Sequence, residues 1–372
     1  MDAGACQAQR RHRDIHSHRV ARAPPQDLRG TGHVSLAAPR PAFSPVLQRF
    51  RRSHEFWLLA VILALCLVLS LATNSFLTLQ NLFDLLTSNA FVGIMASGLL
   101  VVLIAGGIDI SFTATASVAQ YVALTLAIRY GLGWFAMFAI AGGIGIACGA
   151  INALFITRLR ISSIIVSIAT LNIFYGLLIF FSGGKYITSL PKFFRDGIWW
   201  FEYDDAGGTP YALNLQILVL ALAFLSAWLL LNRTNIGRQI YALGGNKDAA
   251  QRLGFHVVRL NFLVYGYLGL IAGIASLVQA QLAQSVTPTV LVGKELDVLA
   301  AVVLGGASLT GGVGTVFGAI LGVTLLAILQ NGLVLLGVSS YWNQWFVGLT
   351  ILCAVSITAW RDRRQRSMKS IA

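Results

Sequence analysis

The chain has 372 residues, of which 56% are hydrophobic and only 11% are charged, and its formal net charge is +13. Soluble globular proteins carry about 25% charged residues, so this composition excludes a soluble domain and indicates a membrane protein with many spans. The positive charge does not indicate a nucleic-acid partner, because the basic residues lie at the ends of apolar runs, where they determine topology.

The N-terminal segment, residues 1–48, differs from the rest of the chain. It contains five of the eight prolines and several arginines, and it has no apolar periodicity. Such a segment cannot bury enough apolar surface to offset the entropy cost of ordering its backbone. We therefore predict a disordered, basic, proline-rich tail.

Ten apolar runs follow, and crossing a bilayer takes about 20 such residues. The third and the eighth run are short and weakly apolar, which is typical of broken or partly re-entrant helices. The pattern predicts an all-α polytopic membrane protein within residues 49–360, with about ten transmembrane helices, or eight if the short pair is re-entrant. In chain order the runs are Phe56–Ala72, Leu82–Ala105, Thr113–Ile128, Trp134–Ile156, Ile161–Phe181, Leu213–Leu231, Val257–Gln281, Leu296–Leu309, Val313–Leu336 and Trp342–Trp360.

The distribution of lysine and arginine predicts the orientation of these spans. With the N-terminus in the cytoplasm, the cytoplasmic segments would hold 22 of the 27 basic residues. These segments are the N-terminal tail with the residues up to the first apolar run, the turn 157–160, the segment 232–259 and a basic C-terminal tail, 361–372. Positive residues favour the cytoplasmic side, so we predict that both termini lie in the cytoplasm.

Residues 232–259 form a polar interruption between two apolar runs. The segment reads NRTNIGRQIYALGGNKDAAQRLGFHVVR and carries five basic residues against one acid. Its middle predicts a short helix, with Asn246 as N-cap, Asp248 in the first turn and Gly254 as the stop. Ala249 and Leu253, four residues apart, would give this helix an apolar face. We expect it to bind a cytoplasmic partner; the alternative is a plain basic connecting loop.

On the opposite side of the membrane, the longest predicted segment is residues 182–212. It combines aromatic residues with the most acidic stretch of the chain. Aromatic side chains suit the membrane interface. The segment therefore either docks an external partner or caps the helix bundle.

The sequence contains no signature of catalysis. The nearest match to a phosphate-binding loop, Gly183-Gly184-Lys185, lacks the earlier glycine and is followed by tyrosine. The four cysteines do not have metal-ligand spacing. We predict no catalytic residue, no metal site and no cofactor in this chain.

Polar residues at membrane depth suggest a pathway for a solute. A buried acid costs about 2.5–3.5 kcal/mol on insertion scales, so such residues need a reason to be there. We expect Asp109 to cap a helix at a glycine break, and in-span amides to suit a neutral hydroxylated solute. Helix packing, or solvation at the interface, is the alternative role.

The stretch VVLIAGGIDIS at Val101–Ser111 also resembles VVLGGASLTGG at Val302–Gly312, in that an apolar run stops at a glycine pair and restarts. Repeated glycine-interrupted helices are a mark of transporters with a midplane pathway. The candidate pathway residues are Asn89, Asp109, Ser111, Asn172, Gln279, Asp297, Gly305, Gly306, Ser308 and Asn331.

Three stretches carry a family resemblance. They are AGGIDIS at Ala105–Ser111, GRQIYALGGNKDAAQRLGF at Gly237–Phe255 and ELDVLAAVVLGGASLTGGVGTVFGAILG at Glu295–Gly322. The chain resembles the permease subunits of ribose/galactose-type bacterial ABC sugar importers, which are related to the branched-chain amino acid permeases. The resemblance covers about residues 50–360.

This resemblance implies an inner-membrane permease that works with a second permease copy or paralogue, a cytoplasmic ABC ATPase and a periplasmic sugar-binding protein. ATP and Mg²⁺ would bind the ATPase, and this chain would be no enzyme itself. Residues 232–259 would form the coupling loop that docks on the ATPase. Its expected coupling residues are Arg238, Gly245, Asn246, Ala249, Ala250, Arg252 and Gly254.

Two other functions stay open on sequence alone. An ion-coupled secondary transporter would take up a small polar solute without ATP, although no succession of acids indicates a proton relay. A membrane scaffold or receptor would transport nothing.

Overall fold

The computed structural model describes residues 54–204 and 210–339, together with scattered positions between 341 and 356. The predicted tails 1–48 and 361–372 and most of the tenth apolar run lie outside the described residues. The disorder predicted for the N-terminal tail and the span predicted for the tenth run therefore stay predictions.

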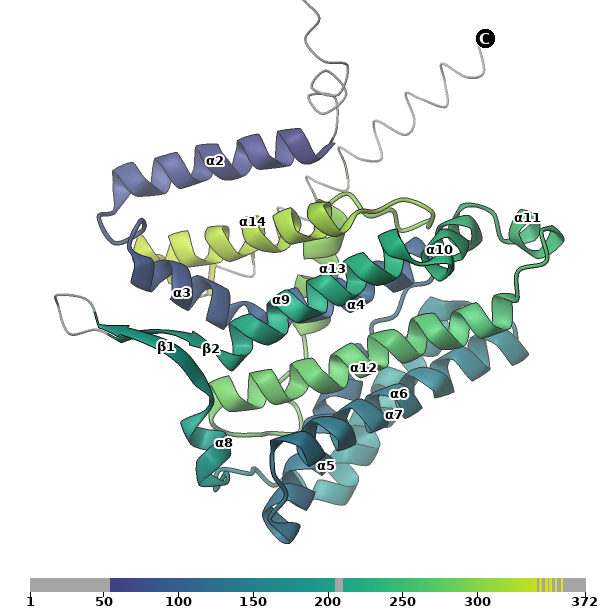
Figure 1. Cartoon of the computed structure of the whole chain (residues 1–372), viewed down its shortest axis with the longest axis horizontal. Coiled ribbons are helices and arrows are strands. Elements are labelled where there is room, and N and C mark those ends of the chain that lie inside the picture. The colour runs from purple at the N-terminus through teal and green to yellow at the C-terminus, as the bar shows by residue number, and fades with distance from the viewer. Residues whose placement is uncertain are drawn as a thin grey trace, which may run out of the picture. The chain divides into compact units, whose positions relative to one another are not determined.

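Most of the described chain is helical, and the long helices run side by side (Figure 1). A π-helical turn, Leu229–Arg233, continues α9. The helices are α2 (His54–Ala72), α3 (Leu79–Ser88), α4 (Ala90–Ile104), α5 (Phe112–Tyr130), α6 (Trp134–Arg158), α7 (Ser163–Ser182), α8 (Lys192–Asp196), α9 (Leu215–Trp228), α10 (Asn235–Gly245), α11 (Lys247–Arg252), α12 (Val257–Ala283), α13 (Lys294–Leu304) and α14 (Val316–Leu335).

Among the described residues, six helices are long and apolar enough to cross a bilayer, or seven if α3 and α4 count as one bent span. These six are α2, α6, α7, α9 with its π-helical turn, α12 and α14. The prediction of a multi-span helical membrane protein is therefore confirmed. The number ten stays a prediction.

Close glycine contacts hold α6 against α12. A Cβ atom on Gly145 would lie 1.9 Å from the carbonyl oxygen of Gly269, and one on Gly269 would lie 2.0 Å from that of Gly145. Only glycine permits this crossing, because in lipid helices associate through close packing of small residues rather than through hydrophobic burial. The close approach of the two helices therefore explains why both α6 and α12 carry glycine at this contact. On the other side of α12, α4 is buried along almost its whole length.

Three predicted spans differ from the structure. The run Leu82–Ala105 is not one helix, because α3 and α4 meet at Asn89 with a bend of 51°. The Asn89 side chain donates to the carbonyl of Leu85 and so satisfies the end of α3. The third run, with short and weakly apolar sequence, forms the unbroken 19-residue helix α5. The eighth run is indeed short: α13 has 11 residues and ends at Leu304.

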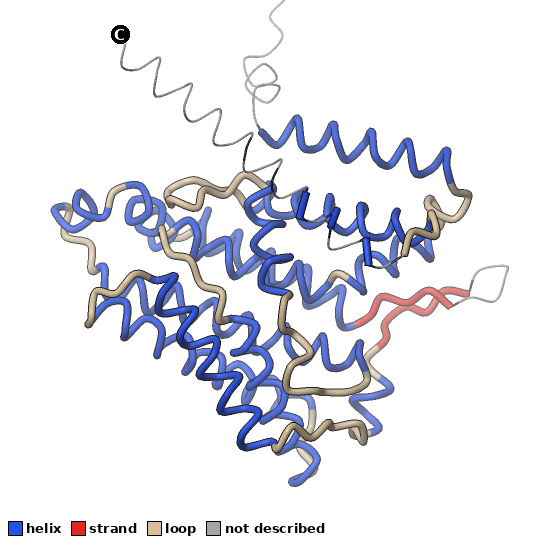
Figure 2. The backbone as a smooth tube through the Cα atoms, turned by 180° about the vertical axis from the view of Figure 1, so that it is seen from behind, coloured by secondary structure: helices blue, strands red, loops and turns tan. Residues whose placement is uncertain are grey.

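The segment 182–212 contains structure that the sequence patterns did not predict. Strands β1 (Trp199–Asp204) and β2 (Pro210–Asn214) form an antiparallel hairpin, with Trp199 opposite Asn214. Ile187 forms an isolated antiparallel bridge with Val286, which ties this segment to the loop after α12. In Figure 2 the hairpin extends from the end of the bundle opposite α10 and α11.

Candidate functional site

The polar segment 232–259 folds into two helices rather than one. Before the predicted short helix lies α10, whose N-cap Thr234 accepts a hydrogen bond from the Gly237 amide at 3.0 Å. α11 follows after the single residue Asn246, whose side-chain oxygen accepts from the Ala249 amide at 3.0 Å. The predicted cap is confirmed, and Gly254 follows the helix with φ +83°. Sequence reasoning missed α10.

α11 presents an apolar side chain to its surroundings. Leu253 is 70% exposed, whereas Ala250 is buried against the rest of the loop. Ala249 is exposed as well, as are Arg252 and Gly254. An exposed leucine at the end of a capped helix is a surface that a partner protein can cover.

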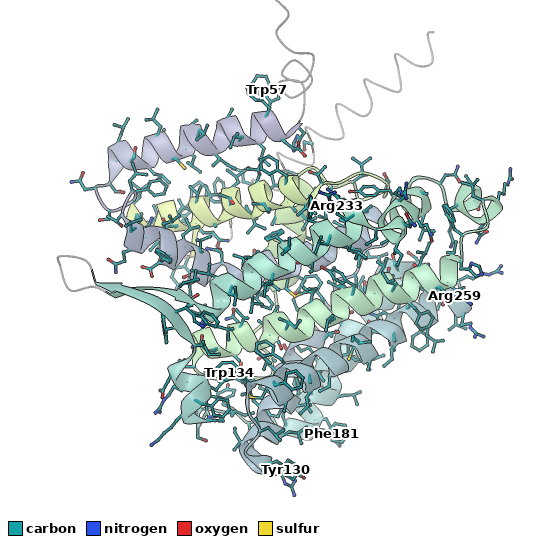
Figure 3. All side chains as sticks on the ribbon, in the orientation of Figure 1. Trp57, Tyr130, Trp134, Phe181, Arg233 and Arg259 are labelled. Atoms are coloured by element: carbon teal, nitrogen blue, oxygen red, sulfur yellow. The ribbon has the colours of Figure 1, made fainter. Side chains whose placement is uncertain are left out.

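The other predicted coupling residues lie around this helix pair. Arg238 is exposed on α10 and donates to the Asn235 side chain. Gly245 ends α10 and is exposed. In Figure 3 Arg233 and Arg259 lie at the end of the bundle that carries these helices, whereas Trp134, Phe181 and Tyr130 lie toward the other end. We refer to the first as the α11 end.

Asp109 lies at the centre of a buried hydrogen-bond network between α4 and α5. Its Oδ1 accepts from the backbone amide and from the hydroxyl of Ser111, both at 2.7 Å. Its Oδ2 accepts from the Asn152 side-chain amide at 3.1 Å, and the same amide donates to the Ser111 hydroxyl at 2.7 Å. Asp109 is 2% exposed and Ser111 is fully buried. Asp109 is not the predicted N-cap: the N-cap residue of α5 is Ser111, without a side-chain capping bond, and Asp109 instead accepts from the amide of that residue.

Asn152 comes from α6 and was not a candidate from the sequence. It lies among small and apolar residues in its own helix, so its partner could be identified only from tertiary structure. It places the start of α5 beside the interior of α6, since Asn152 lies six residues, roughly 9 Å along the helix, before the end of α6 at Arg158.

α13 begins next to the first turn of α5 and ends at the α11 end. The Glu295 carboxylate accepts from the Thr113 hydroxyl at 3.2 Å and from the Gly293 amide at 3.0 Å. At the other end, His54 Nε2 donates to the Leu304 carbonyl at 2.9 Å. Figures 1 and 2 show α13 running across the direction of the long helices. Its first turn therefore lies beside the first turn of α5.

The first turn of α13 carries exposed charges. Lys294 Nζ lies 3.3 Å from Asp297 Oδ2, and the two side chains are 49% and 23% exposed. Nearby, α5 carries a polar stripe of Thr113, Ser117 and Gln120, all buried. The hydroxyl of Ser117 and the amide of Gln120 have no hydrogen-bond partner among the described residues.

The remaining pathway candidates do not share one location. Asn89 lies at the α3–α4 bend, and Asn331 exchanges two hydrogen bonds with Asn81 of α3. Asn172 is exposed on α7 and donates to its own helix, at the Ile168 carbonyl. Gln279 is half-buried on α12. Gly305, Gly306 and Ser308 lie together in the turn after α13.

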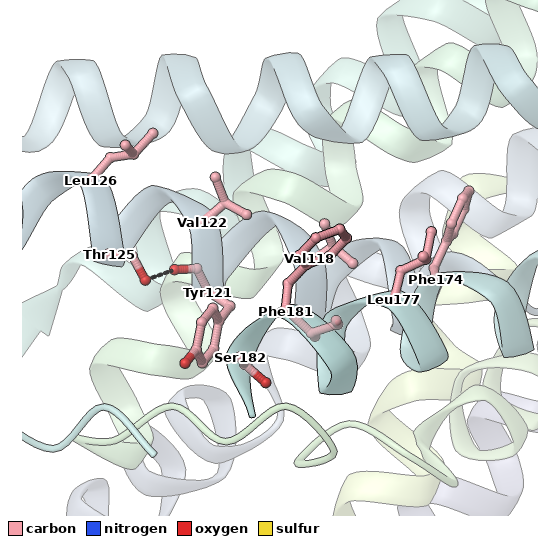
Figure 4. Close-up of a pocket in the computed structure, with 10 residues that line it drawn as sticks. Val118, Tyr121, Val122, Thr125, Leu126, Phe174, Leu177, Phe181 and Ser182 are labelled. Carbon is pink, nitrogen blue, oxygen red and sulfur yellow. Dashed lines mark hydrogen bonds between the residues drawn. The ribbon is translucent and has the colours of Figure 1, made fainter. Parts of the chain in front are cut away.

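A groove between α5 and α7 has a volume of about 290 Å³ (Figure 4). Its walls are almost wholly apolar, with Val118, Leu126, Phe174 and Phe181 among them. Thr125 is occupied by a hydrogen bond to the Tyr121 carbonyl. This groove offers few groups to a hydroxylated solute. No group of three His, Cys, Asp or Glu side chains in the described part of the chain could hold a metal ion.

Residues 81–355, well over half of the chain, match the family of branched-chain amino acid transport system permease components. The chain belongs to this family. The permease family match confirms the resemblance drawn from the three sequence stretches, which all overlap the matched region.

Similar proteins include several sugar permeases. The ribose import permease RbsC of Escherichia coli (strain K12) is 33% identical over 302 residues, 81% of this chain and 92% of that protein. RbsC of Bacillus subtilis (strain 168) is 36% identical over 293 residues, which are 78% of this chain and 88% of that protein. The L-arabinose ABC transporter permease AraH of Azospirillum brasilense is 33% identical over 334 residues, which are 89% of this chain and 94% of that protein. No solved structure matches the chain.

The substitution Asp109→Asn tests the buried network. The new amide keeps an oxygen for Ser111 but turns an NH₂ group toward the Asn152 amide, so that two donors face each other. An unsatisfied buried donor costs about 1–3 kcal/mol, and we expect the thermal unfolding midpoint of the purified permease to fall. Adding Asn152→Asp restores a donor–acceptor pair and should recover part of the loss. An unchanged midpoint in Asp109→Asn would contradict the network.

Proposed function

We propose that the chain is the membrane-spanning permease of an ABC importer that carries a neutral sugar or sugar-like solute across the inner membrane. The permease family match carries this proposal. The named relatives transport ribose and L-arabinose, and the chain aligns with 88% or more of the length of each. The ion-coupled transporter has no support in these comparisons.

The α11 end would face the cytoplasm, with ten spans in all. The basic residues around α10 and α11 favour this side of the membrane. A separate ATPase would bind α11 and hydrolyse ATP with Mg²⁺, since the chain has no phosphate-binding loop of its own. The exposed Leu253 supports this docking site, and exposed Arg238 and Arg252 are suited to acidic groups on the ATPase or to lipid headgroups.

The solute pathway would run past the first turn of α13. Exposed charges at membrane depth cannot face hydrocarbon without a cost of several kcal/mol. Lys294 and Asp297 would therefore face water in a pathway shared with a second permease copy. The unpaired polar atoms of Ser117 and Gln120 support a hydrated region beside it. A soluble binding protein would deliver the sugar to the opposite end, near the β1–β2 hairpin.

Leu253→Asp tests the docking of α11. Burial of a leucine side chain at an interface contributes about 1.5–3 kcal/mol. We therefore expect the aspartate to weaken co-purification of the cognate ATPase by about tenfold or more, while the permease still inserts into the membrane.

The matched control is Leu159→Asp, which places the same change on the turn after α6. Leu159 is 60% exposed, close to the 70% of Leu253. This control should leave ATPase binding unchanged. Equal binding by both variants would count against α11 as the docking helix.

Asp297→Cys tests the pathway in a background in which the four native cysteines are serine. A membrane-impermeant, charged thiol reagent needs water to reach its target, so we expect the cysteine to be labelled in the assembled transporter. Ile173→Cys on α7 is the control, because Ile173 is 54% exposed near the middle of this apolar helix. Labelling of Ile173→Cys alone, or of neither variant, would refute the pathway at α13.

A further inference from the structure

Two helices end in the same way at the α11 end. Gly106 follows α4 with φ +83°, and Gly306 follows α13 with φ +91°. In both places the next amide returns to a carbonyl five residues earlier, from Gly107 at 3.1 Å and from Ala307 at 3.2 Å. This is the glycine-dependent helix ending in which a left-handed residue satisfies the last carbonyls. The internal resemblance between the two stretches is therefore a repeated backbone structure.

Close backbone contacts join these two ends. The Gly312 amide, in the turn that follows α13, donates to the Ile104 carbonyl at the end of α4 at 2.9 Å. A Cβ on Gly311 would lie 2.6 Å from the Cα of Gly106. No side chain fits between the segments, so one cannot shift without the other.

α10 lies against both segments. A Cβ on Gly244, near the end of α10, would lie 1.8 Å from the Ile104 carbonyl oxygen and 2.5 Å from the Gly312 nitrogen. One helical turn earlier, the Tyr241 hydroxyl donates to the Gly314 carbonyl at 2.7 Å. We call Gly106, Gly244, Gly311 and Gly312 the glycine junction.

The same helix is tied directly to the exposed α11. A single residue, Asn246, separates α10 from α11, and its amide donates to the Ala242 carbonyl at 3.0 Å. On its other face α10 buries Ile240 completely in the core that contains α4. A displacement of α11 would therefore act on α10, and at Gly244 the backbone of α10 meets the end of α4 and the turn after α13 directly.

We propose that the glycine junction transmits movement of α11 to α4 and α13, and that Gly244 is the positioning residue of this transmission. This proposal rests on the function proposed above, because the moving partner is the ATPase bound at α11. α13 carries the charged first turn at the pathway, so a shift of its other end would change that turn. Packed backbones of this kind are suited to transmit displacement, since they have discrete rather than continuously deformable arrangements.

Two helical glycines, Gly244 and Gly176, provide a matched experiment. Gly244→Ala forces backbone atoms of two segments apart, whereas a Cβ on Gly176 of α7 would meet no described atom within 4 Å. Each variant is reconstituted with the ATPase and the binding protein, and ATPase association, ATP hydrolysis and sugar uptake are measured separately. We expect Gly244→Ala to keep ATPase association while uptake per ATP hydrolysed falls at least about tenfold. Gly176→Ala should resemble the wild type in all three measurements.

Two outcomes overturn the proposal: uptake by Gly244→Ala equal to that of Gly176→Ala, or loss of ATPase association in Gly244→Ala. If Gly244→Ala does not accumulate in the membrane, Tyr241→Phe replaces it as the test variant. This substitution removes only the hydroxyl that donates to the Gly314 carbonyl. Reduced uptake per ATP in Tyr241→Phe then supports the junction, and unchanged uptake rejects it. The wild-type measurement tests the proposed function separately. A wild-type chain that binds no ATPase would contradict the proposed importer, whereas a defect confined to Gly244→Ala concerns only the glycine junction.

Discussion

Backbone groups inside a bilayer have to find hydrogen-bond partners within the protein, and this constraint explains most of the structure. Several helices of this permease end at membrane depth or close to it. The start of α5 is satisfied by Asp109 and the end of α4 by the Gly312 amide, while the end of α13 is satisfied by His54. Each such ending brings together segments that are distant in the sequence. The glycine breaks and the buried acid are consequences of this requirement.

These helix endings divide the chain into a part that is packed along its whole length and a part whose helices stop short. The α6–α12 pair is held by glycine contacts along its length and provides a rigid frame. α4 and α13 instead stop short, and at Gly244 their ends meet the backbone of α10. Such an arrangement suits a transporter powered by another subunit. In the proposed importer α11 would provide the docking surface, and the charged turn at Lys294 and Asp297, beyond the junction, would border the pathway.

Much of this could be predicted from local sequence. The cap at Asn246 and the helix stop at Gly254 follow from residue types in particular positions, and both are confirmed. In contrast, α10 was missed because its sequence, NIGRQIYALGG, contains three glycines and reads as a loop. Asn152 and Gly244 were missed because their partners come from other helices, and a single sequence does not show such contacts. The bend at Asn89 was missed because the apolar run continues through it.

The central claim is that this permease moves its solute only when a separate ATPase hydrolyses ATP. The most direct test is sugar uptake into proteoliposomes that contain the permease, its cognate ATPase and the binding protein. The account predicts uptake with ATP and Mg²⁺, and none when a non-hydrolysable analogue replaces ATP or when the ATPase is omitted. Uptake by the permease alone, driven by a proton or sodium gradient, would contradict it.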